Sequence, residues 1–549
     1  LLSFAIEYKF FGLNPLVYHI TNLLLHLINV LMVFRLLRML KLDPVPAAIA
    51  ALIWSIHPMR VESVAWVTER KDLLYSLFFL PSLIFYIKSI QVKEKHHFYT
   101  LLSISFFLLS LLSKIQAVVL PLCLLLIDYY FERPLKFNLI VRKIPYFVLA
   151  LVIGLIGINF LKAESVVKFN DNLLPLSYRL MYGLYALSSY LVKFVYPFHL
   201  SALYPYSVGP GQNFPAIYYV NLLLLPLLAF AVFRSTKCTR IVAFGTLFFL
   251  VNVVFMLQIL RAGTTYLSDR YTYMAYIGLS FLAGSAFQHL SSNKWLIRMA
   301  YAVVSIYLAV MVIGTRERCK IWYNEETLWT NVIKQYPGQH ILPYLNRADF
   351  YKRTEHYDKS LQDYTIVNKL DPHEVKALVR LGLLKMYRKD YEGAVADYKK
   401  AIELKPGILD TYQNLGAIYC IQQKYDSAVA VTLRGIRRGP DFISFYTNLG
   451  YYYIEMDKWA EAEESFTACL AREPNDMGSN VGMALLAYHA GQPETAAKYL
   501  AKAEKLEPRM KKGMEGINQL EKAGYMYTGK VKQMLTGLFA LAHAARPAR

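Results

Sequence analysis

Long apolar runs fill the first three-fifths of this 549-residue chain and restrict the folds open to it. Most residues up to about position 315 lie in runs of roughly 15–22 apolar positions, the length of helix that crosses a bilayer core. A mean hydropathy of +0.30 agrees with this. A helix satisfies its own backbone hydrogen bonds in lipid, so the sequence predicts a transmembrane helix bundle. The expected spans are 17–34, 44–57, 72–89, 98–112, 115–131, 144–161, 217–233, 240–258, 271–288 and 299–314.

Lysine and arginine collect in alternate loops between these runs, which predicts the orientation of the chain. If those loops are cytoplasmic, residues 1–16 and everything after the last span lie outside the cytoplasm, and one more span should precede Leu1. This requires that residues 178–198 form an interfacial or re-entrant helix; a crossing there would invert every later loop. The loop cations are Arg35, Arg38, Lys41, Lys88, Lys93, Lys95, Arg133, Lys136, Arg142, Lys143, Arg234, Lys237, Arg240, Lys294 and Arg298.

The formal net charge of +21 comes largely from these lysine and arginine residues in the loops. In a soluble protein it would indicate nucleic-acid binding, but here much of it lies in loops that set topology, so we predict no nucleic-acid partner. The cysteines stand singly, which argues against a disulfide framework, and we expect neither a metal nor a cofactor. The sequence lacks P-loop, GxGxxG, HExxH and GxSxG motifs, so nucleotide-driven transport and zinc proteolysis are not indicated.

A proline recurs every 34 residues in the last third of the chain, the length of a tetratricopeptide repeat (TPR). Small residues recur with the same period where the helices of a repeat approach closely. The chain is thus expected to be all-α, a polytopic bundle followed by a TPR solenoid. The repeat residues are Pro372, Pro406, Pro440, Pro474 and Pro508, Gly382, Gly416 and Gly450, and Ala394, Ala428, Ala462 and Ala496. The predicted divisions are a membrane domain at 1–318, a connector at 319–340, five repeats at 341–508, and a capping helix and tail at 509–549.

A TPR array offers a concave surface to polypeptides but carries no chemistry by itself. We therefore expect the repeats to bind a partner or a substrate polypeptide. The alternative is an array that only stabilises or oligomerises the membrane half.

Polar residues gather at the predicted extracytoplasmic ends of the spans, where ionisable groups usually face a cavity. His19, Asn22, His26 and Asn29 share one helix face, which predicts either interhelical hydrogen bonds or a cavity wall. Further charges lie in segment 57–72, at Ser113-Lys114 and in segment 261–273. Cations on this side run against the positive-inside bias, so we expect them to hold a phosphate or diphosphate. Individually, snorkelling would also explain them. They are Arg70, Lys71, Lys114, Arg261 and Arg270.

Four strings of the sequence resemble the transmembrane-and-TPR protein O-mannosyltransferase family and its prokaryotic relatives. They are GLNPLVYHITNLLLHLINVL, HPMRVESVAWVTERKDLLYSLFF, LLSKIQAVVLPLCLLLIDYY and SDRYTYMAYIGL. Together with the repeats, the resemblance covers nearly the whole chain. The pattern HPxxVExVxWxxxRKD is highly specific, and SDRYTY is moderately so.

The resemblance implies a GT-C glycosyltransferase fold with eleven spans, which the ten predicted here and one before Leu1 would supply. It implies transfer of a sugar from a polyprenyl-phosphate donor to a protein, with a carboxylate of the first outer loop as general base. That carboxylate is expected upstream of Leu1, because Glu7 has a structural or acceptor-side place. Without it, the chain as given would be inactive.

Residues that match the family's motifs are expected to form the rest of the site. The resemblance places Arg70, Lys114 and Arg270 on the lipid phosphate, with Glu62 and Asp72 orienting them. The supporting residues are His57, Glu62, Asp72, Asp269, Tyr271, His19 and His26.

Two other functions remain open from the sequence: a non-catalytic membrane scaffold that presents the TPR array, and a transporter or polymerase of lipid-linked glycans. The expected partners are membrane lipid, a lipid-linked sugar and a polypeptide. The short array favours a prokaryotic plasma membrane over the endoplasmic reticulum, with the repeats outside the cytoplasm in either case.

Overall fold

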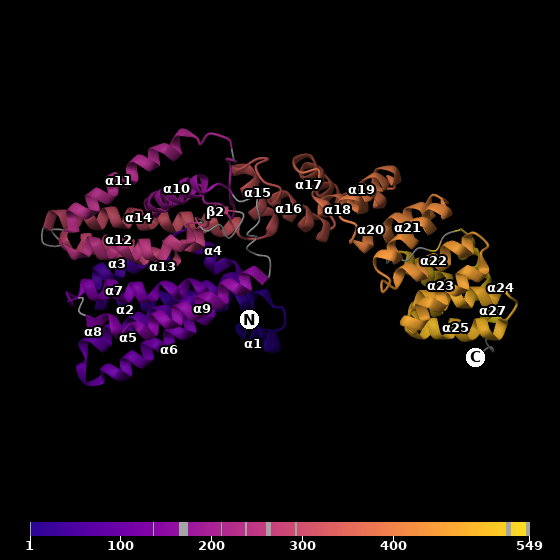
Figure 1. Cartoon of the computed structure of the whole chain (residues 1–549), viewed down its shortest axis with the longest axis horizontal. Coiled ribbons are helices and arrows are strands. Elements are labelled where there is room, and N and C mark those ends of the chain that lie inside the picture. Colours follow the sequence, from indigo (N-terminus) through magenta and orange to yellow (C-terminus); the bar gives the residue numbers. More distant parts are fainter. Residues whose placement is uncertain are drawn as a thin grey trace. The chain divides into compact units, whose positions relative to one another are not determined.

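The structure, a computed structural model, describes residues 2–134, 137–163, 174–209, 211–236, 239–257, 259, 265–290, 294–522, 527 and 529–544 (Figure 1). Arg261, Lys136, Lys237 and the last five residues lie outside this part of the chain. The chain forms two compact units, Leu1–Pro343 and Tyr344–Arg549. Apart from one pair of short strands, the described elements are helices, which confirms the predicted all-α class.

The first unit is a helix bundle with short helical segments at its ends (Figure 1). Its elements are α1 (Leu2–Phe11), α2 (Pro15–Met39), α3 (Pro44–Ser55), α4 (Arg60–Ala65), η1 (Val67–Glu69), α5 (Arg70–Gln91), η2 (Lys93–Lys95), α6 (His96–Ser113), η3 (Ile115–Val119), α7 (Leu120–Tyr130), α8 (Phe137–Val141), α9 (Ile144–Ala163), α10 (Leu176–Val195), β1 (Tyr204–Pro205), α11 (Ala216–Thr236), α12 (Arg240–Val253), η4 (Val254–Met256), β2 (Thr265–Leu267), η5 (Asp269–Tyr271), α13 (Thr272–Leu290), α14 (Lys294–Ile321) and α15 (Glu325–Gln335).

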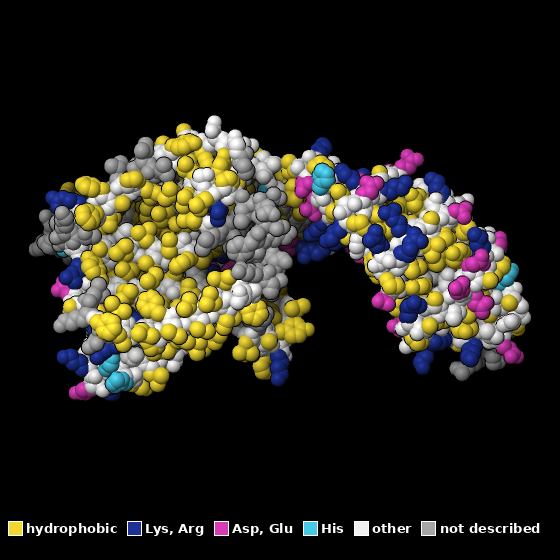
Figure 2. Space-filling view, viewed as in Figure 1, with side chains coloured by type: hydrophobic (Ala, Val, Ile, Leu, Met, Phe, Trp, Pro, Cys, Tyr) yellow, Lys and Arg dark blue, Asp and Glu magenta, His cyan; other side chains and the backbone are white. Residues whose placement is uncertain are grey.

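Five helices in the described residues are long and apolar enough to span a membrane, in agreement with a multi-pass membrane protein. They are Pro15–Met39, Val67–Gln91, Lys93–Ser113, Leu139–Phe160 and Trp295–Ile321, and shorter apolar helices occupy Pro44–Ser55, Ile115–Tyr130 and Arg240–Met256. Hydrophobic side chains cover much of the visible face of this unit (Figure 2). An apolar surface of this extent is suited to lipid.

Local signals in the sequence explain where several of these helices begin. The Asn14 side chain accepts a hydrogen bond of 3.1 Å from the Leu16 amide and caps α2, whose first residue is Pro15. α3 likewise starts at a proline, Pro44. α13 lies at the centre of the bundle, and nearly every residue from Thr272 to Phe281 is buried there.

α4, η1, η5 and the paired strands β1 and β2 lie at one end of the bundle, which we call the motif end. Tyr204 pairs with Leu267 in the antiparallel strands. Both halves of α10 contact this end: the Tyr182 ring meets Tyr266 of β2, and the Tyr190 hydroxyl donates to the Ser268 carbonyl at 3.1 Å. α9 ends and α11 begins on the same side, so these contacts agree with a helix α10 that does not cross the bundle.

The predicted connector is largely helical. α14 continues to Ile321, seven residues beyond the predicted end of the last span, and α15 follows after a short turn. A reciprocal capping box between Asn324 and Thr327 starts α15, because each side chain satisfies the other residue's backbone amide. Residues 319–340 were predicted to be a connector because the polar face of α15 interrupts the apolar pattern of the sequence.

The second unit contains the predicted helix pairs (Figure 1). The pairs are α16 (Leu342–Arg353) with α17 (Tyr357–Leu370), α18 (Val375–Tyr387) with α19 (Tyr391–Leu404), α20 (Leu409–Ile421) with α21 (Tyr425–Arg438), α22 (Ser444–Glu455) with α23 (Trp459–Arg472), and α24 (Met477–His489) with α25 (Pro493–Leu506). They are followed by η6 (Pro508–Lys512), α26 (Met514–Lys522) and α27 (Gly529–Ala544). Each second helix ends two residues before a periodic proline, because proline cannot continue a helix.

The periodic glycines lie against side chains of the second helices, which are buried rings at Gly382 and Gly450. A Cβ atom at Gly450 would come within 2.5 Å of the Phe466 ring, and one at Gly382 within 2.9 Å of Tyr398. At Gly416 the nearest atom is the Thr432 hydroxyl, 3.0 Å away. A side chain at these positions would push the two helices of a repeat apart.

We expect Gly450→Val to lower the free energy of unfolding by about 1–3 kcal/mol, because the added methyl groups overpack the contact with Phe466. Thermal unfolding of the detergent-solubilised chain, followed by circular dichroism, measures this. Gly407→Val is the control, since nothing lies within 4 Å of a Cβ atom there. Equal melting temperatures for the two variants would contradict the packing argument.

Candidate functional site

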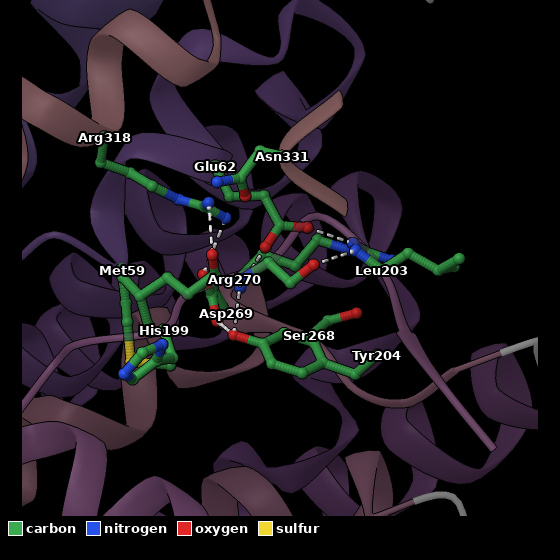
Figure 3. Close-up of polar contacts among 12 residues, drawn as sticks. Met59, Glu62, His199, Leu203, Tyr204, Ser268, Asp269, Arg270, Arg318 and Asn331 are labelled. Carbon is green, nitrogen blue, oxygen red and sulfur yellow. Dashed lines mark hydrogen bonds and ion pairs between the residues drawn. The ribbon is translucent and has the colours of Figure 1, made fainter. Parts of the chain in front are cut away.

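The charged segments singled out in the sequence meet at the motif end of the bundle (Figure 3). α4 and η1 carry Glu62 and Glu69, and η5 carries Asp269 and Arg270, about 200 residues later in the chain. The turn between α6 and η3 adds Lys114. A single cluster of ion pairs therefore joins three motifs that are distant in sequence.

Arg270 is held between two carboxylates of this cluster. Its guanidinium bonds to the Glu62 carboxylate, which also accepts from the Arg270 backbone amide at 3.2 Å, and its Nε lies 3.6 Å from Glu69. The guanidinium also lies over the Trp66 ring, 5.4 Å from its centroid. Glu62 is buried, whereas the Arg270 side chain keeps 19% of its exposure. Arg270 is thus oriented by the protein and still reachable by a ligand.

Lys114 forms the second half-buried cation. Its ammonium pairs with the buried Asp72, and its side chain is 13% exposed. The Tyr271 ring is close to both cations: its centroid is 6.0 Å from the Lys114 Nζ and 5.0 Å from the Arg270 guanidinium. Two partly exposed cations therefore contact the same aromatic ring at the end of the bundle.

Arg70 differs from the other two predicted phosphate ligands. Its side chain is fully buried, with Nη1 2.5 Å from Glu7, Nε 2.8 Å from the Asn22 amide oxygen and Nη2 3.1 Å from the Tyr18 carbonyl. Each of the three nitrogens bonds inside the protein and the side chain has no exposed surface, so a phosphate does not reach Arg70 in this structure. The role of Glu7 follows from the same contacts: it joins α1 to the bundle.

Asp269 is paired with a residue that the sequence reasoning missed. Its carboxylate lies 3.2 Å from the Arg318 Nη2 and accepts a hydrogen bond of 2.7 Å from the Tyr204 hydroxyl (Figure 3). Arg318 also donates to the Leu200 carbonyl at 2.8 Å. Nothing in the sequence singled out Arg318, which follows the last apolar run by four residues.

Arg60 is a buried cation of this end for which the described residues offer no carboxylate within ion-pair distance. It is 2% exposed and donates one hydrogen bond, to Thr272. The rings of Tyr273 and Tyr276 have centroids 5.2 and 5.3 Å from its guanidinium. Burial lowers the pKa of Arg60 to about 10, so it remains charged at neutral pH. Aromatic faces stabilise the cation in place of a carboxylate.

The predicted polar stripe of α2 bonds to neighbouring helices. The His26 Nδ1 lies 2.7 Å from the Tyr273 hydroxyl, and Asn29 donates to the Leu73 carbonyl at 3.0 Å. Asn22 donates to the Val64 carbonyl at 3.2 Å. His19, on the same stripe, is exposed. Of the two interpretations left open by the sequence, these contacts correspond to interhelical hydrogen bonding.

His57 also has a position inside the protein. Its Nδ1 accepts from the Met59 amide at 3.3 Å, and its ring stacks on Phe194. In the part of the chain that the structure describes, no three His, Cys, Asp or Glu side chains lie together as metal ligands would. The expected absence of a metal stays a prediction.

Burial shifts the protonation of the Glu62–Arg270 pair. It raises the pKa of Glu62 to about 7, an effect that outweighs the attraction of Arg270. Burial alone would lower the pKa of Arg270, but the Glu62 carboxylate raises it well above its usual range. Near neutral pH, Arg270 is therefore always charged, while Glu62 changes between its neutral and ionised forms.

Two kinds of known protein resemble this chain. Tetratricopeptide-repeat family models match residues 375–407 and 447–510. The human protein O-mannosyl-transferase TMTC4 is 39% identical over 136 residues, which are 21% of this chain and 18% of that protein. Protein O-mannosyl-transferase F38B6.6 of Caenorhabditis elegans is 25% identical over 347 residues, or 61% of this chain and 48% of that protein. The chain thus spans about half or less of the length of these relatives.

Among solved structures, YrrB, a TPR protein with an unusual peptide-binding site, is 18% identical with a TM-score of 0.29, covering 35% of this chain and 97% of its own. MamA is 21% identical with a TM-score of 0.28 and coverages of 34% and 98%. The sequence relatives and the repeat matches confirm the resemblance expected from the sequence: this chain is similar to the TMTC-type protein O-mannosyl-transferases and carries tetratricopeptide repeats.

Proposed function

We propose that this protein is a glycosyltransferase that moves a sugar from a polyprenyl-phosphate donor to a protein hydroxyl on the extracytoplasmic side of a membrane. The observation that carries the proposal is the pair of half-buried cations, Lys114 and Arg270, that both lie close to the Tyr271 ring at the motif end. A lipid phosphate lies at the membrane surface, which is where the apolar helices of this bundle end. The related proteins are named as O-mannosyl-transferases.

In this reaction, a serine or threonine oxygen of the acceptor attacks the anomeric carbon of the sugar. The bond between that carbon and the phosphate oxygen breaks, and the electron pair leaves with the lipid phosphate. Lys114 and Arg270 stabilise the negative charge that grows on the phosphate. A general base takes the hydroxyl proton. We assign that role to none of Glu7, Glu62, Glu69, Asp72 and Asp269, because each is held in an ion pair.

The repeats supply the acceptor in this proposal, since TPR arrays bind polypeptides. The sequence favours a prokaryotic plasma membrane over the endoplasmic reticulum, and we retain both, with the repeats outside the cytoplasm. A cysteine-accessibility assay on the single cysteine variants Asn331→Cys and Arg234→Cys, in membranes, tests the side. Labelling of the first and protection of the second by an impermeant maleimide is expected, and the reverse pattern would place the repeats in the cytoplasm.

A transfer assay tests the reaction itself. The protein, expressed from its complete coding sequence and purified, is incubated with a polyprenyl-phosphate sugar carrying a radiolabel, and the label is followed into protein, free lipid products and polysaccharide. Label in protein supports the proposal. Label only in polysaccharide would favour a polymerase.

A non-catalytic scaffold is the second candidate, and one observation favours it: Lys114 and Arg270 already have carboxylate partners. In a scaffold these ion pairs would only hold the helices together. Failure of the chain to bind a polyprenyl phosphodiester would support the scaffold, provided that a cooperative melting transition shows the protein to be folded.

Donor binding should weaken as the pH rises through 7. Below that pH the buried Glu62 is protonated and leaves the charge of Arg270 to the phosphate; above it, the ionised carboxylate competes for the guanidinium. We expect the affinity for a polyprenyl phosphodiester, whose own charge is constant, to fall by about three- to tenfold between pH 6 and pH 8. Equilibrium binding of a fluorescent donor analogue measures this.

Glu62→Gln is the matched control, because glutamine keeps the shape of the side chain and cannot ionise. The variant should bind the phosphodiester with the same affinity at both pH values. Asp269, Arg318 and Glu69 are other charged groups near the pair. A pH effect of the same size in Glu62→Gln would contradict the assignment of the titration to Glu62.

A further inference from the structure

The helix α27 lies on the face of the TPR array that such arrays use to bind ligands. The first helices of neighbouring repeats touch each other, which places them along one side of the solenoid, the concave side. α27 packs against two of these first helices, α22 and α24, of the fourth and fifth repeats. A helix of this chain therefore occupies the position of a bound polypeptide.

The apolar contacts of α27 follow one face of the helix. Val531, Leu535 and Leu538 are buried at 2%, 0% and 1% exposure and belong to the same core cluster as Val481 and Leu485 of α24. Their spacing of four and three residues is that of an amphipathic helix. The opposite face, with Gln533 and Thr536, is exposed. The buried face of α27 therefore resembles the apolar face by which an amphipathic helix binds in a groove.

Polar contacts fix the start of α27. The Glu455 carboxylate of α22 accepts hydrogen bonds from the Lys530 and Val531 amides at 3.0 and 3.1 Å, and so caps the helix. The Lys530 ammonium lies 2.5 Å from Asp457 and over the Trp459 ring. The fourth repeat thus recognises both the amino-terminal end of a helix and a cation beside it.

The array does not need α27 to close its end. η6 and α26 already follow the last repeat, and Ile517 and Leu520 of α26 are fully buried in that cluster. α27 also touches α25 and α26, but most of its contacts are with α22 and α24. It therefore lies mainly on the face that such arrays use for ligands.

We propose that the α22–α24 face binds an amphipathic helix with a lysine or arginine at its start, and that α27 is the occupant that a partner polypeptide must displace. The inference rests on the proposed role of the repeats in binding polypeptides and adds the class of segment they bind. It also predicts that the free site is revealed when α27 is detached.

The test uses a fluorescent peptide with the sequence of residues 529–544 and measures its binding to the detergent-solubilised protein. We expect the double variant Leu535→Asp/Leu538→Asp, in which α27 cannot bury its apolar face, to bind the peptide at least tenfold more tightly than the unaltered chain. Gln533→Ala/Thr536→Ala changes the exposed face and should behave like the unaltered chain. A peptide carrying the two aspartates should not bind.

Equal peptide binding by the unaltered chain and the double aspartate variant would overturn the proposal, because α27 would then not occlude the site. Absence of peptide binding to the variant would also overturn it, whether or not the melting temperature falls, since α27 would then be an integral part of the fold. Glu455→Gln in the double-variant background should weaken the peptide severalfold. The assay needs no sugar donor, so failure of sugar transfer leaves this result unaffected.

Discussion

Replacement of Arg270 with alanine should reduce sugar transfer by about 10²–10³-fold, the effect of removing one preorganised donor from a developing negative charge. Glu62 and Glu69 hold the guanidinium in place before the donor arrives, so no reorganisation is needed when the phosphate leaves. The fold should survive, because the pKa of Glu62 lies near 7 and the carboxyl can take up a proton when its partner is removed. Radiolabel incorporation into protein measures the loss.

Two further variants separate charge from geometry at this position. Arg270→Lys keeps the charge but loses the planar fork, and we expect it to fall between the unaltered protein and the alanine variant. Arg240→Ala removes a cation of the opposite end, where Arg240 bonds to the Tyr129 carbonyl, and should leave transfer unchanged. Full transfer by Arg270→Ala would rule out the assignment of Arg270 to the phosphate.

Replacement of Arg70 with alanine should destabilise the membrane unit by about 3–5 kcal/mol, because it leaves the buried Glu7 without a cation. Three hydrogen bonds are lost together, to Glu7, Asn22 and the Tyr18 carbonyl. Thermal unfolding in detergent, followed by light scattering and intrinsic fluorescence, gives the change. A shift as small as that of a surface substitution would contradict the buried ion pair.

The double variant Glu7→Leu/Arg70→Met distinguishes the two roles considered for Arg70. If Arg70 only joins α1 to the bundle, replacing both partners with apolar residues should restore most of the stability and keep donor binding. If Arg70 also holds the lipid phosphate, as its motif suggested, the double variant should be stable and fail to bind the donor.

The sequence predicted what depends on local periodicity. Proline cannot continue a helix, so the 34-residue spacing located the ends of α17, α19, α21, α23 and α25. The apolar runs located the helices that are long enough to span a membrane, because a bilayer core requires about 20 apolar residues in one helix. The partners of the charged residues were not predictable. Spacing along the sequence indicates which face of a helix a residue occupies but not which distant residue contacts it, and Glu62 and Arg270 are 208 residues apart.

The missed residues share a physical cause. Arg318 is one of several cations that follow the last apolar run, and nothing in the sequence distinguishes an exposed cation from one that pairs with a buried carboxylate. The position of α27 could not be predicted either, because an apolar helix face can cap the solenoid, contact a second copy of the chain or bind in a groove of the array. Only the contacts with Glu455 and α24 select among these.

The ion pairs of the motif end have a summed charge that affects anion binding. Glu7, Glu62, Glu69, Asp72 and Asp269 balance Arg70, Lys71, Lys114, Arg270 and Arg318, so the paired set is neutral when every acid is ionised. Arg60, which is charged and stands outside these pairs, leaves this end of the bundle with a net positive charge, and a proton on Glu62 adds to it. We therefore expect capture of a phosphodiester near pH 7 to be accompanied by uptake of a proton at Glu62.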